Sequence, residues 1–368
     1  MNIRNLFVIC LYFGTSETEV VKSYNECWPH RFFYQGFPPT LLTYSKDIVI
    51  ICQQFKNEPR YVTLYDTKNR IPLFSATQPT QADVLKTKSD KNGKPETRDQ
   101  FFIEPNLADK GGKNMIEYQP ENLNLNNPHD AKYGQKQALD VDYRVRDKHV
   151  YDRGHLNPQL FNNKDDNSKI ATNALTNIAP QYKEFNQNTW KKLEEGIKKN
   201  LRENCIEVFP GARMFVVVGV EPSSNKFIPE KPKRARFPGS KKKQKIKTQS
   251  ENTYGRINVP KSYWTAVCCD TSALPNIDNR RKGWSFAYEA DNFEDKTKIK
   301  VVFHPVEKFL QHRYSSIFAD YTNNGNNVQA CQFNKENAVT IIQDMAKKIS
   351  GHIFDTNTLL KNFYPNKV

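Results

Sequence analysis

Residues 151–158 have the sequence Tyr-Asp-Arg-Gly-His-Leu-Asn-Pro, and the chain around them predicts two short strands followed by a helix. Gly154 is expected to form a turn at the end of the first strand, because glycine lets the backbone bend and expose the imidazole of His155. The helix would carry Asn186 at its start and Glu194 two turns later. We therefore expect this unit to bring an imidazole, an amide oxygen and a carboxylate together.

These residue types suit metal-assisted phosphodiester hydrolysis. An imidazole titrates near neutral pH, so His155 is the candidate general base. Mg²⁺ prefers oxygen ligands and retains several waters, so Asn186 alone could anchor it, with Glu194 holding a metal-bound water. Structural explanations compete with each assignment: Asn186 could cap the helix, and Glu194 could pair with Lys198 four residues later.

The remaining sequence predicts an α+β fold built around an antiparallel sheet. A continuous β-branched run at 214–220 is typical of a central strand that is buried on both faces. Residues 77–127 are polar and predict long surface loops with short helices. Apolar and β-branched runs predict further strands and a closing helix: strands at 48–52, 61–65, 175–178, 256–259, 263–268, 284–288 and 298–303, and a helix at 337–349.

The composition favours a folded, basic protein with a polyanionic partner. Hydrophobic residues make up 37% of the 368 residues, and the formal net charge is +15. Such a field attracts nucleic acid, although a basic secreted protein with a structural or adhesive role would carry the same charge. Residues 231–247 predict a mobile basic loop that grips phosphates; a solvated insertion is the alternative. Its candidate nucleic-acid-binding residues are Arg234, Arg236, Lys241, Lys242 and Lys243.

The first 16 residues predict a signal peptide, because a positive charge precedes a short apolar run and small residues. The expected product is one secreted domain covering 17–368, without a membrane span. Six cysteines remain after the leader, and they allow 15 pairings. We expect Cys27 to pair with Cys52, and adjacent Cys268 and Cys269 to take different partners. The spacing of these cysteines does not favour a structural zinc site.

Three motifs resemble the DNA/RNA non-specific endonuclease family: 151–158, the Leu-Thr-Asn-Ile-Ala-Pro-Gln stretch at 175–181, and 185–194. The resemblance implies a ββα-metal (His-Me finger) active-site unit in a disulfide-stapled α+β domain with long surface loops. It implies Mg²⁺ as the cofactor, with Mn²⁺ as a substitute. The residue roles that it implies are His155 as base, Asn186 as the sole protein ligand of the metal, Glu194 beside the metal and Asn177 in support.

Two roles follow less directly from the motifs. Arg153 is expected to steady the phosphate, and Asp152 to brace the turn. Arg70 and Arg144 are candidates for a further phosphate-binding arginine upstream of the motif. Residues 27–76 and 264–270 also resemble secreted endonuclease domain-containing 1 proteins. The implied activity is secreted, sequence-tolerant cleavage of DNA and RNA that leaves 5′-phosphate ends; the alternative is a catalytically weak nucleic-acid-binding protein of the same fold.

Overall fold

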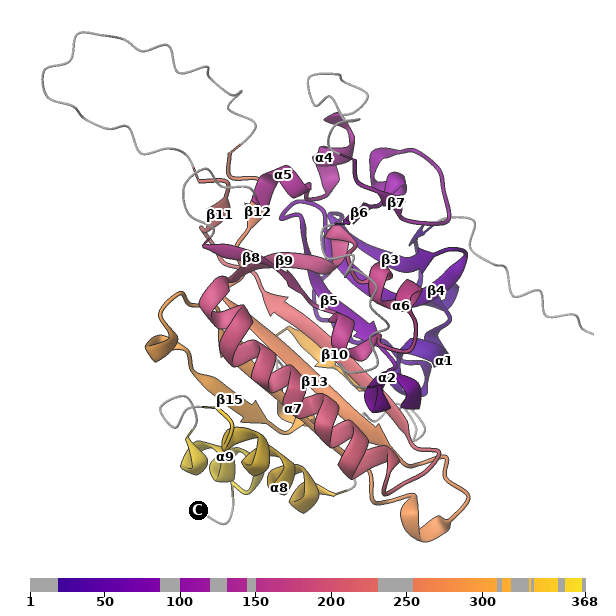
Figure 1. The fold of residues 1–368 in the computed structure, drawn as a ribbon, viewed down its shortest axis with the longest axis vertical. Coiled ribbons are helices and arrows are strands. Elements are labelled where there is room, and N and C mark those ends of the chain that lie inside the picture. Colours follow the sequence, from indigo (N-terminus) through magenta and orange to yellow (C-terminus); the bar gives the residue numbers. More distant parts are fainter. Residues whose placement is uncertain are drawn as a thin grey trace, which may run out of the picture.

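An eight-stranded antiparallel sheet forms the centre of the protein, in the strand order β1-β3-β4-β5-β10-β13-β14-β15 (Figure 1). The computed structural model describes residues 19–86, 100–119, 131–143, 150–230, 254–309, 313–318, 331, 334–349 and 355–365. The strands of the sheet are β1 (Val20–Val21), β3 (Ile48–Phe55), β4 (Glu58–Asp66), β5 (Ile71–Thr77), β10 (Arg213–Glu221), β13 (Ser262–Asp270), β14 (Trp284–Asp291) and β15 (Val301–His304). The predicted α+β class is confirmed.

Shorter elements surround this sheet. Four two-stranded ladders pair β8 (Tyr151–His155) with β9 (Ile178–Tyr182), β11 (Phe227–Ile228) with β12 (Ile257–Asn258), β6 (Phe102–Ile103) with β7 (Ile116–Glu117), and β2 (Thr40–Leu41) with β16 (Tyr314–Ser316). The α-helices are α1 (Pro29–Phe32), α2 (Gln81–Leu85), α4 (Tyr133–Lys136), α5 (Asp140–Tyr143), α6 (Asp166–Ala171), α7 (Lys191–Leu201), α8 (Lys335–Ala346) and α9 (Thr356–Phe363). Within the described ranges, no helix is long and apolar enough to cross a bilayer.

The strands predicted at 48–52 and 61–65 form the hairpin β3–β4. Lys56 and Asn57 connect them with φ angles of 54° and 59°. Two consecutive residues with positive φ make a type I′ turn, whose twist matches that of the paired strands. The hairpin prediction is therefore confirmed, although both strands extend beyond the predicted apolar runs.

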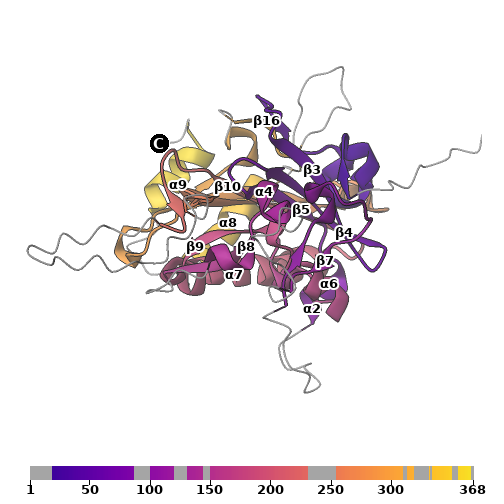
Figure 2. The same ribbon diagram turned by 90° about the horizontal axis from the view of Figure 1, so that it is seen from above.

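The predicted central strand is β10, which pairs with β5 on one side and β13 on the other. Its side chains alternate between two hydrophobic clusters: Met214 and Val216 belong to the cluster under α7, whereas Phe215 and Val217 belong to the opposite one. A strand with apolar layers on both faces has no polar face, which explains its continuous apolar sequence. Figure 2 shows α7, β8 and α6 on one side of the sheet and β16 on the other.

Three disulfides join these layers: Cys27–Cys52, Cys205–Cys269 and Cys268–Cys331. The expected Cys27–Cys52 bridge is confirmed. Cys268 and Cys269 are consecutive on β13, so their side chains enter opposite faces of the sheet and reach different partners. The predicted signal peptide at 1–16 and the basic segment at 231–247 lie outside the described residues.

Candidate active site

The ladder β8–β9 carries the motif that the sequence singled out. Its five residue pairs run from Tyr151 opposite Tyr182 to His155 opposite Ile178. The second strand begins at Ile178 rather than Leu175, because 175–177 form a 3-10 turn. A helical segment follows, so the order strand, strand, helix agrees with the sequence prediction (Figure 1).

The expectation that Gly154 forms a turn is wrong, because this residue lies inside β8. A side chain there would collide with Gln181, whose Oε1 lies 2.4 Å from the position of an added Cβ. The hydroxyl of Tyr263 lies 3.0 Å from the same position. Glycine is therefore required for close packing of the ladder on the sheet, while the strand itself delivers His155.

A fixed hydrogen-bond network holds the imidazole of His155. Its Nε2 lies 3.1 Å from Oδ1 of Asn173, and its Nδ1 lies 3.2 Å from the carbonyl oxygen of Arg153. The amide of Asn173 is oriented because its Nδ2 donates to the carbonyl of Gln100, and because Gln159 donates to its Oδ1. Both ring nitrogens therefore face acceptor oxygens, so the neutral ring can carry its proton on either nitrogen, and both contacts favour the protonated ring.

The surroundings also keep this imidazole neutral. Burial lowers the pKa of His155, and the nearby Arg153 charge lowers it further. The hydrogen bonds to Asn173 and to the Arg153 carbonyl oppose this change. A neutral imidazole is the form that a general base requires.

Asp152 connects the first strand to the helical segment. Its Oδ2 accepts hydrogen bonds from Nδ2 of Asn186 and from Nε2 of Gln187, both at 2.9 Å. The amide of Asn186 is thereby oriented, with its oxygen directed away from the carboxylate. Asp152 was expected to brace a turn at Gly154; it lies in β8 instead and holds the amide of the candidate metal ligand Asn186.

The segment that carries Asn186 is a π-helix over Phe185–Trp190, and the regular helix α7 begins only at Lys191. An α-helical spacing between Asn186 and Glu194 is therefore wrong, because a π turn closes hydrogen bonds five residues apart. Trp190 is buried against Tyr263 and Tyr288, with ring centroids 5.5 Å from each. These contacts fix the helix on the sheet, and the wide turn then sets the direction of Asn186.

Glu194 is half-buried on α7. Burial raises the pKa of its carboxyl group to about 8; the neighbouring Glu195 also raises this pKa, whereas Trp190 lowers it. The raised pKa favours the protonated form of this side chain near neutral pH. Such a carboxyl group is suited to an outer position around a metal ion, because bound positive charge favours its ionised form.

The guanidinium of Arg153 is engaged within the protein. It forms an ion pair with the buried Asp140 and lies over the ring of Phe101, 4.8 Å from the centroid. About a third of the side chain is exposed. The sequence motif did not predict Asp140, which lies in a separate helix, α5.

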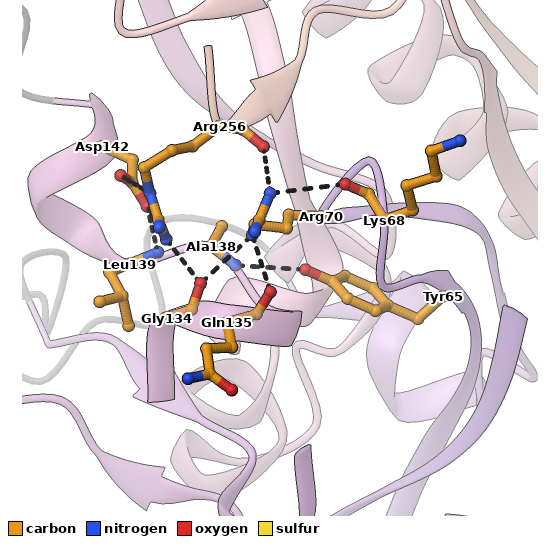
Figure 3. A network of polar contacts seen from close by, with 9 residues as sticks. All are labelled: Tyr65, Lys68, Arg70, Gly134, Gln135, Ala138, Leu139, Asp142 and Arg256. Carbon is orange, nitrogen blue, oxygen red and sulfur yellow. Dashed lines mark hydrogen bonds and ion pairs between the residues drawn. The ribbon is translucent and has the colours of Figure 1, made fainter. Parts of the chain in front are cut away.

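Arg70, a candidate for upstream phosphate binding, binds main-chain oxygens instead. Its guanidinium donates to the carbonyls of Gly134, Gln135 and Arg256 at 2.9–3.2 Å (Figure 3). Arg256 in turn pairs with Asp142. This network ties α4 and α5 to β12, and the arrangement indicates a structural role for Arg70. The other candidate, Arg144, lies outside the described residues.

Asn177 is fully buried and makes four side-chain hydrogen bonds. Its Oδ1 accepts from Ser75 and from the main-chain N–H of Asn157, both at 2.9 Å. Its Nδ2 donates to the carbonyls of Asn157 and Thr172. Asn177 therefore fixes the turn that follows His155, which fits a supporting role.

Five predicted site residues are not described by the structure, and one residue beside His155 was not predicted. The candidate nucleic-acid-binding residues lie outside the described ranges: Arg234, Arg236, Lys241, Lys242 and Lys243. Asn173 was missed, because an asparagine in a polar stretch is most often a turn residue. Its position beside His155 becomes visible only when the turn at 172–174 folds back on β8.

Comparisons with known proteins define the class. The chain belongs to the DNA/RNA non-specific endonuclease family, which matches residues 42–316. It is 27% identical over 290 residues to the Endonuclease domain-containing 1 protein of Mus musculus, covering 79% of this chain and 46% of that protein. It is also 27% identical over 309 residues to the Homo sapiens protein of the same name, covering 84% of this chain and 50% of that protein. The chain thus spans about half the length of these relatives.

Two more distant similarities were found. A nuclease from Nostoc is 28% identical over 117 residues, which is 32% of this chain and 31% of the nuclease. A crystal structure of the EndoG/EndoGI complex matches with a TM-score of 0.39 and 17% identity, covering 66% of this chain and 75% of that one.

Proposed function

We propose that this protein is a secreted, Mg²⁺-dependent endonuclease that hydrolyses phosphodiester bonds of DNA and RNA without reading sequence. The observation that carries the proposal is the oriented imidazole of His155. Its two ring nitrogens lie against the Asn173 amide oxygen and the Arg153 carbonyl oxygen, and in the neutral ring one nitrogen keeps a lone pair that can take a proton. A general base of this kind contributes on the order of 10²–10⁴ to a hydrolysis rate.

The donor set at Asn186 fits a hard cation. Within the described residues, His, Cys, Asp and Glu side chains form no group of three that could hold a metal. One oriented amide oxygen with a carboxyl group nearby on the helix suits Mg²⁺, which keeps most of its waters. Asn186 would hold the ion and Glu194 one of its waters. When bound, Mg²⁺ would supply positive charge beside the scissile phosphate.

The protein groups then have distinct tasks. His155 takes the proton from the attacking water, and the amide oxygen of Asn173 and the carbonyl of Arg153 stabilise the imidazolium that forms. Asp152 keeps the Asn186 oxygen pointed at the metal position. Arg153 would reach a phosphate with the part of its guanidinium that Asp140 leaves open. Three disulfides support an oxidising destination, and the basic loop at 231–247 supports binding to polyanions.

Plasmid cleavage tests the proposal. Supercoiled DNA and a structured RNA would be incubated with the purified protein in Mg²⁺ or in EDTA. We expect Mg²⁺-dependent nicking with 5′-phosphate ends, and a loss of roughly 10²-fold or more in His155→Ala. A matched control is Asn163→Ala, eight residues after His155, whose side chain donates to the carbonyl of Lys86. Tight, salt-dependent binding without cleavage by the folded wild type would instead support the catalytically weak alternative.

A further inference from the structure

Two glutamates meet in the interior beside the N-terminal strand. Glu19 precedes β1, and Glu104 follows β6; both side chains are 0% exposed. One oxygen of each is bound: Oε1 of Glu19 accepts from the main-chain N–H of Gln54 at 2.7 Å, and Oε1 of Glu104 accepts from the hydroxyl of Thr176 at 3.0 Å. Among the described residues, no donor reaches either Oε2 atom.

The two carboxyl groups are partners of each other. The main-chain N–H of Gln54 binds Glu19, and the carbonyl of Gln54 accepts from the N–H of Met115 at 3.2 Å, just before β7, the strand that pairs with β6. This arrangement brings Glu104, which follows β6, beside Glu19, and each Oε2 is an acceptor unless a proton lies between them. Burial is the main cause that raises the pKa of both groups, and Tyr61 is the other titratable side chain that interacts with them. No cation interacts with the pair among the described residues. Two adjacent buried negative charges would be very unfavourable, so one proton must remain.

From this pair, an uninterrupted series of buried hydrogen bonds leads to the active site. Each member is 0–1% exposed. Gln53 Nε2 donates to the hydroxyl of Thr176 (2.8 Å) and to Oγ1 of Thr63 (3.3 Å). Thr63 Oγ1 and Ser75 Oγ are hydrogen-bonded at 2.9 Å, and Ser75 Oγ donates to Oδ1 of Asn177 at 2.9 Å. Asn177 holds both main-chain groups of Asn157, two residues after His155.

We propose that Glu19 and Glu104 share one proton and act, through this series of hydrogen bonds, as positioning residues for the turn that follows His155. The proposal rests on the proposed nuclease function. Its physical basis is that each donor in the series has a fixed direction. Gln53 donates to both threonines, and Thr176 donates to Glu104. Ser75 donates to Asn177, so the hydroxyl of Thr63 must donate to Ser75. The carboxyl pair lies at the end of the series, and the shared proton links Glu19, just before β1, to Glu104.

The pair also makes the fold sensitive to alkali. The folded state binds the shared proton more tightly than the unfolded chain does, because burial raises the pKa of both groups. The stabilising contribution is complete below the ordinary glutamate pKa, and it is lost as pH rises through the raised one. When the proton leaves, the two negative carboxylates repel each other, and the contact that holds Glu19, and with it the start of β1, against Glu104 is lost.

Two substitutions at one position separate the shared proton from mere packing. In Glu19→Gln, the amide can donate to Glu104 without a titrating proton. We expect its melting temperature to fall less between pH 5 and pH 9 than that of the wild type, and its kcat on plasmid DNA to stay within about twofold. Glu19→Ala removes the partner, and we expect kcat to fall roughly tenfold with little change in KM, because positioning affects the chemical step.

Two further variants complete the test. Ser75→Ala interrupts the series without touching the pair, so kcat should fall while the pH dependence of melting stays that of the wild type. Asp270→Asn is the control: it removes a buried carboxylate that pairs with Arg213 elsewhere on the sheet, and it should lower the melting temperature without lowering kcat.

Several outcomes would overturn the inference. A wild-type pH dependence of melting in Glu19→Gln would show that no shared proton titrates. An unchanged kcat in both Glu19→Ala and Ser75→Ala would show that the series does not position His155. If the wild type cleaves nothing, the melting comparison still decides the carboxyl pair, so the two failures remain distinguishable.

Discussion

Replacing Asn173 by alanine should slow cleavage while leaving the candidate metal ligand untouched. The side chain accepts a hydrogen bond from Nε2 of His155 at 3.1 Å, and this bond strengthens when the imidazole gains a proton in the transition state. A hydrogen bond to a charged group contributes about 1.5–3 kcal/mol. Since a tenfold rate change corresponds to about 1.36 kcal/mol, kcat should fall roughly 10- to 150-fold.

The same substitution should move the pH profile. His155 works as a base only when unprotonated, so the rate rises with pH through its pKa. The bond to Asn173 raises that pKa, and burial lowers it. Without the bond the pKa falls further, so the acidic limb of the kcat profile should shift to lower pH while the plateau drops.

The assay is plasmid nicking at saturating Mg²⁺ between pH 5 and pH 9, with kcat and KM determined separately. Asn163→Ala serves as the control, because the side chain of this asparagine donates to the carbonyl of Lys86 and not to His155 in the described structure. An Asn173→Ala protein with wild-type kcat and an unmoved acidic limb would refute the role of Asn173 in supporting His155 as the base.

Three further measurements test other parts of the site. Asp152→Ala removes the acceptor that orients Asn186, so Mg²⁺ affinity measured by calorimetry should fall about 10- to 100-fold, and an unchanged affinity would contradict this role. Because the pKa of Glu194 is about 8, wild-type Mg²⁺ affinity should rise as pH increases through 8, and Glu194→Gln should lack this rise. The Cys205–Cys269 bridge closes 64 residues, so removing it by a double alanine substitution should lower the free energy of unfolding by roughly 4 kcal/mol in denaturant titrations; a loss below about 1 kcal/mol would show that the reduced chain is already constrained.

Local sequence patterns predicted most of the sheet. The β-branched run at 214–220 and the alternating runs around it predicted strands that the structure confirms, because burial on two faces leaves a direct trace in composition. The different partners of Cys268 and Cys269 also followed from local geometry. Their identities did not, because Cys205 and Cys331 approach β13 only through the tertiary fold.

The site was predicted less completely for the same physical reason. Motif residues on β8 and the following helix could be named, because their chemistry is local. The roles of Asn173, Asp140 and Glu104 could not be predicted. Each contacts its partner, which is His155, Arg153 and Thr176 respectively, from a different element of the fold. Gly154 was misinterpreted because glycine serves both turns and close packing, and only the position of Gln181 distinguishes the two.

The π-helical turn at 185–190 makes the site depend on a residue count. Trp190 is held by aromatic contacts to the sheet, and Asn186 is held by Asp152. Removing one residue between them would restore a regular α-helix, in which each position advances by 100°. Asn186 would then turn by about that angle and lose its carboxylate partner. Deletion of one residue from this segment would therefore matter more than most substitutions. Every candidate catalytic side chain would still be present, but Asn186 would no longer point in its present direction.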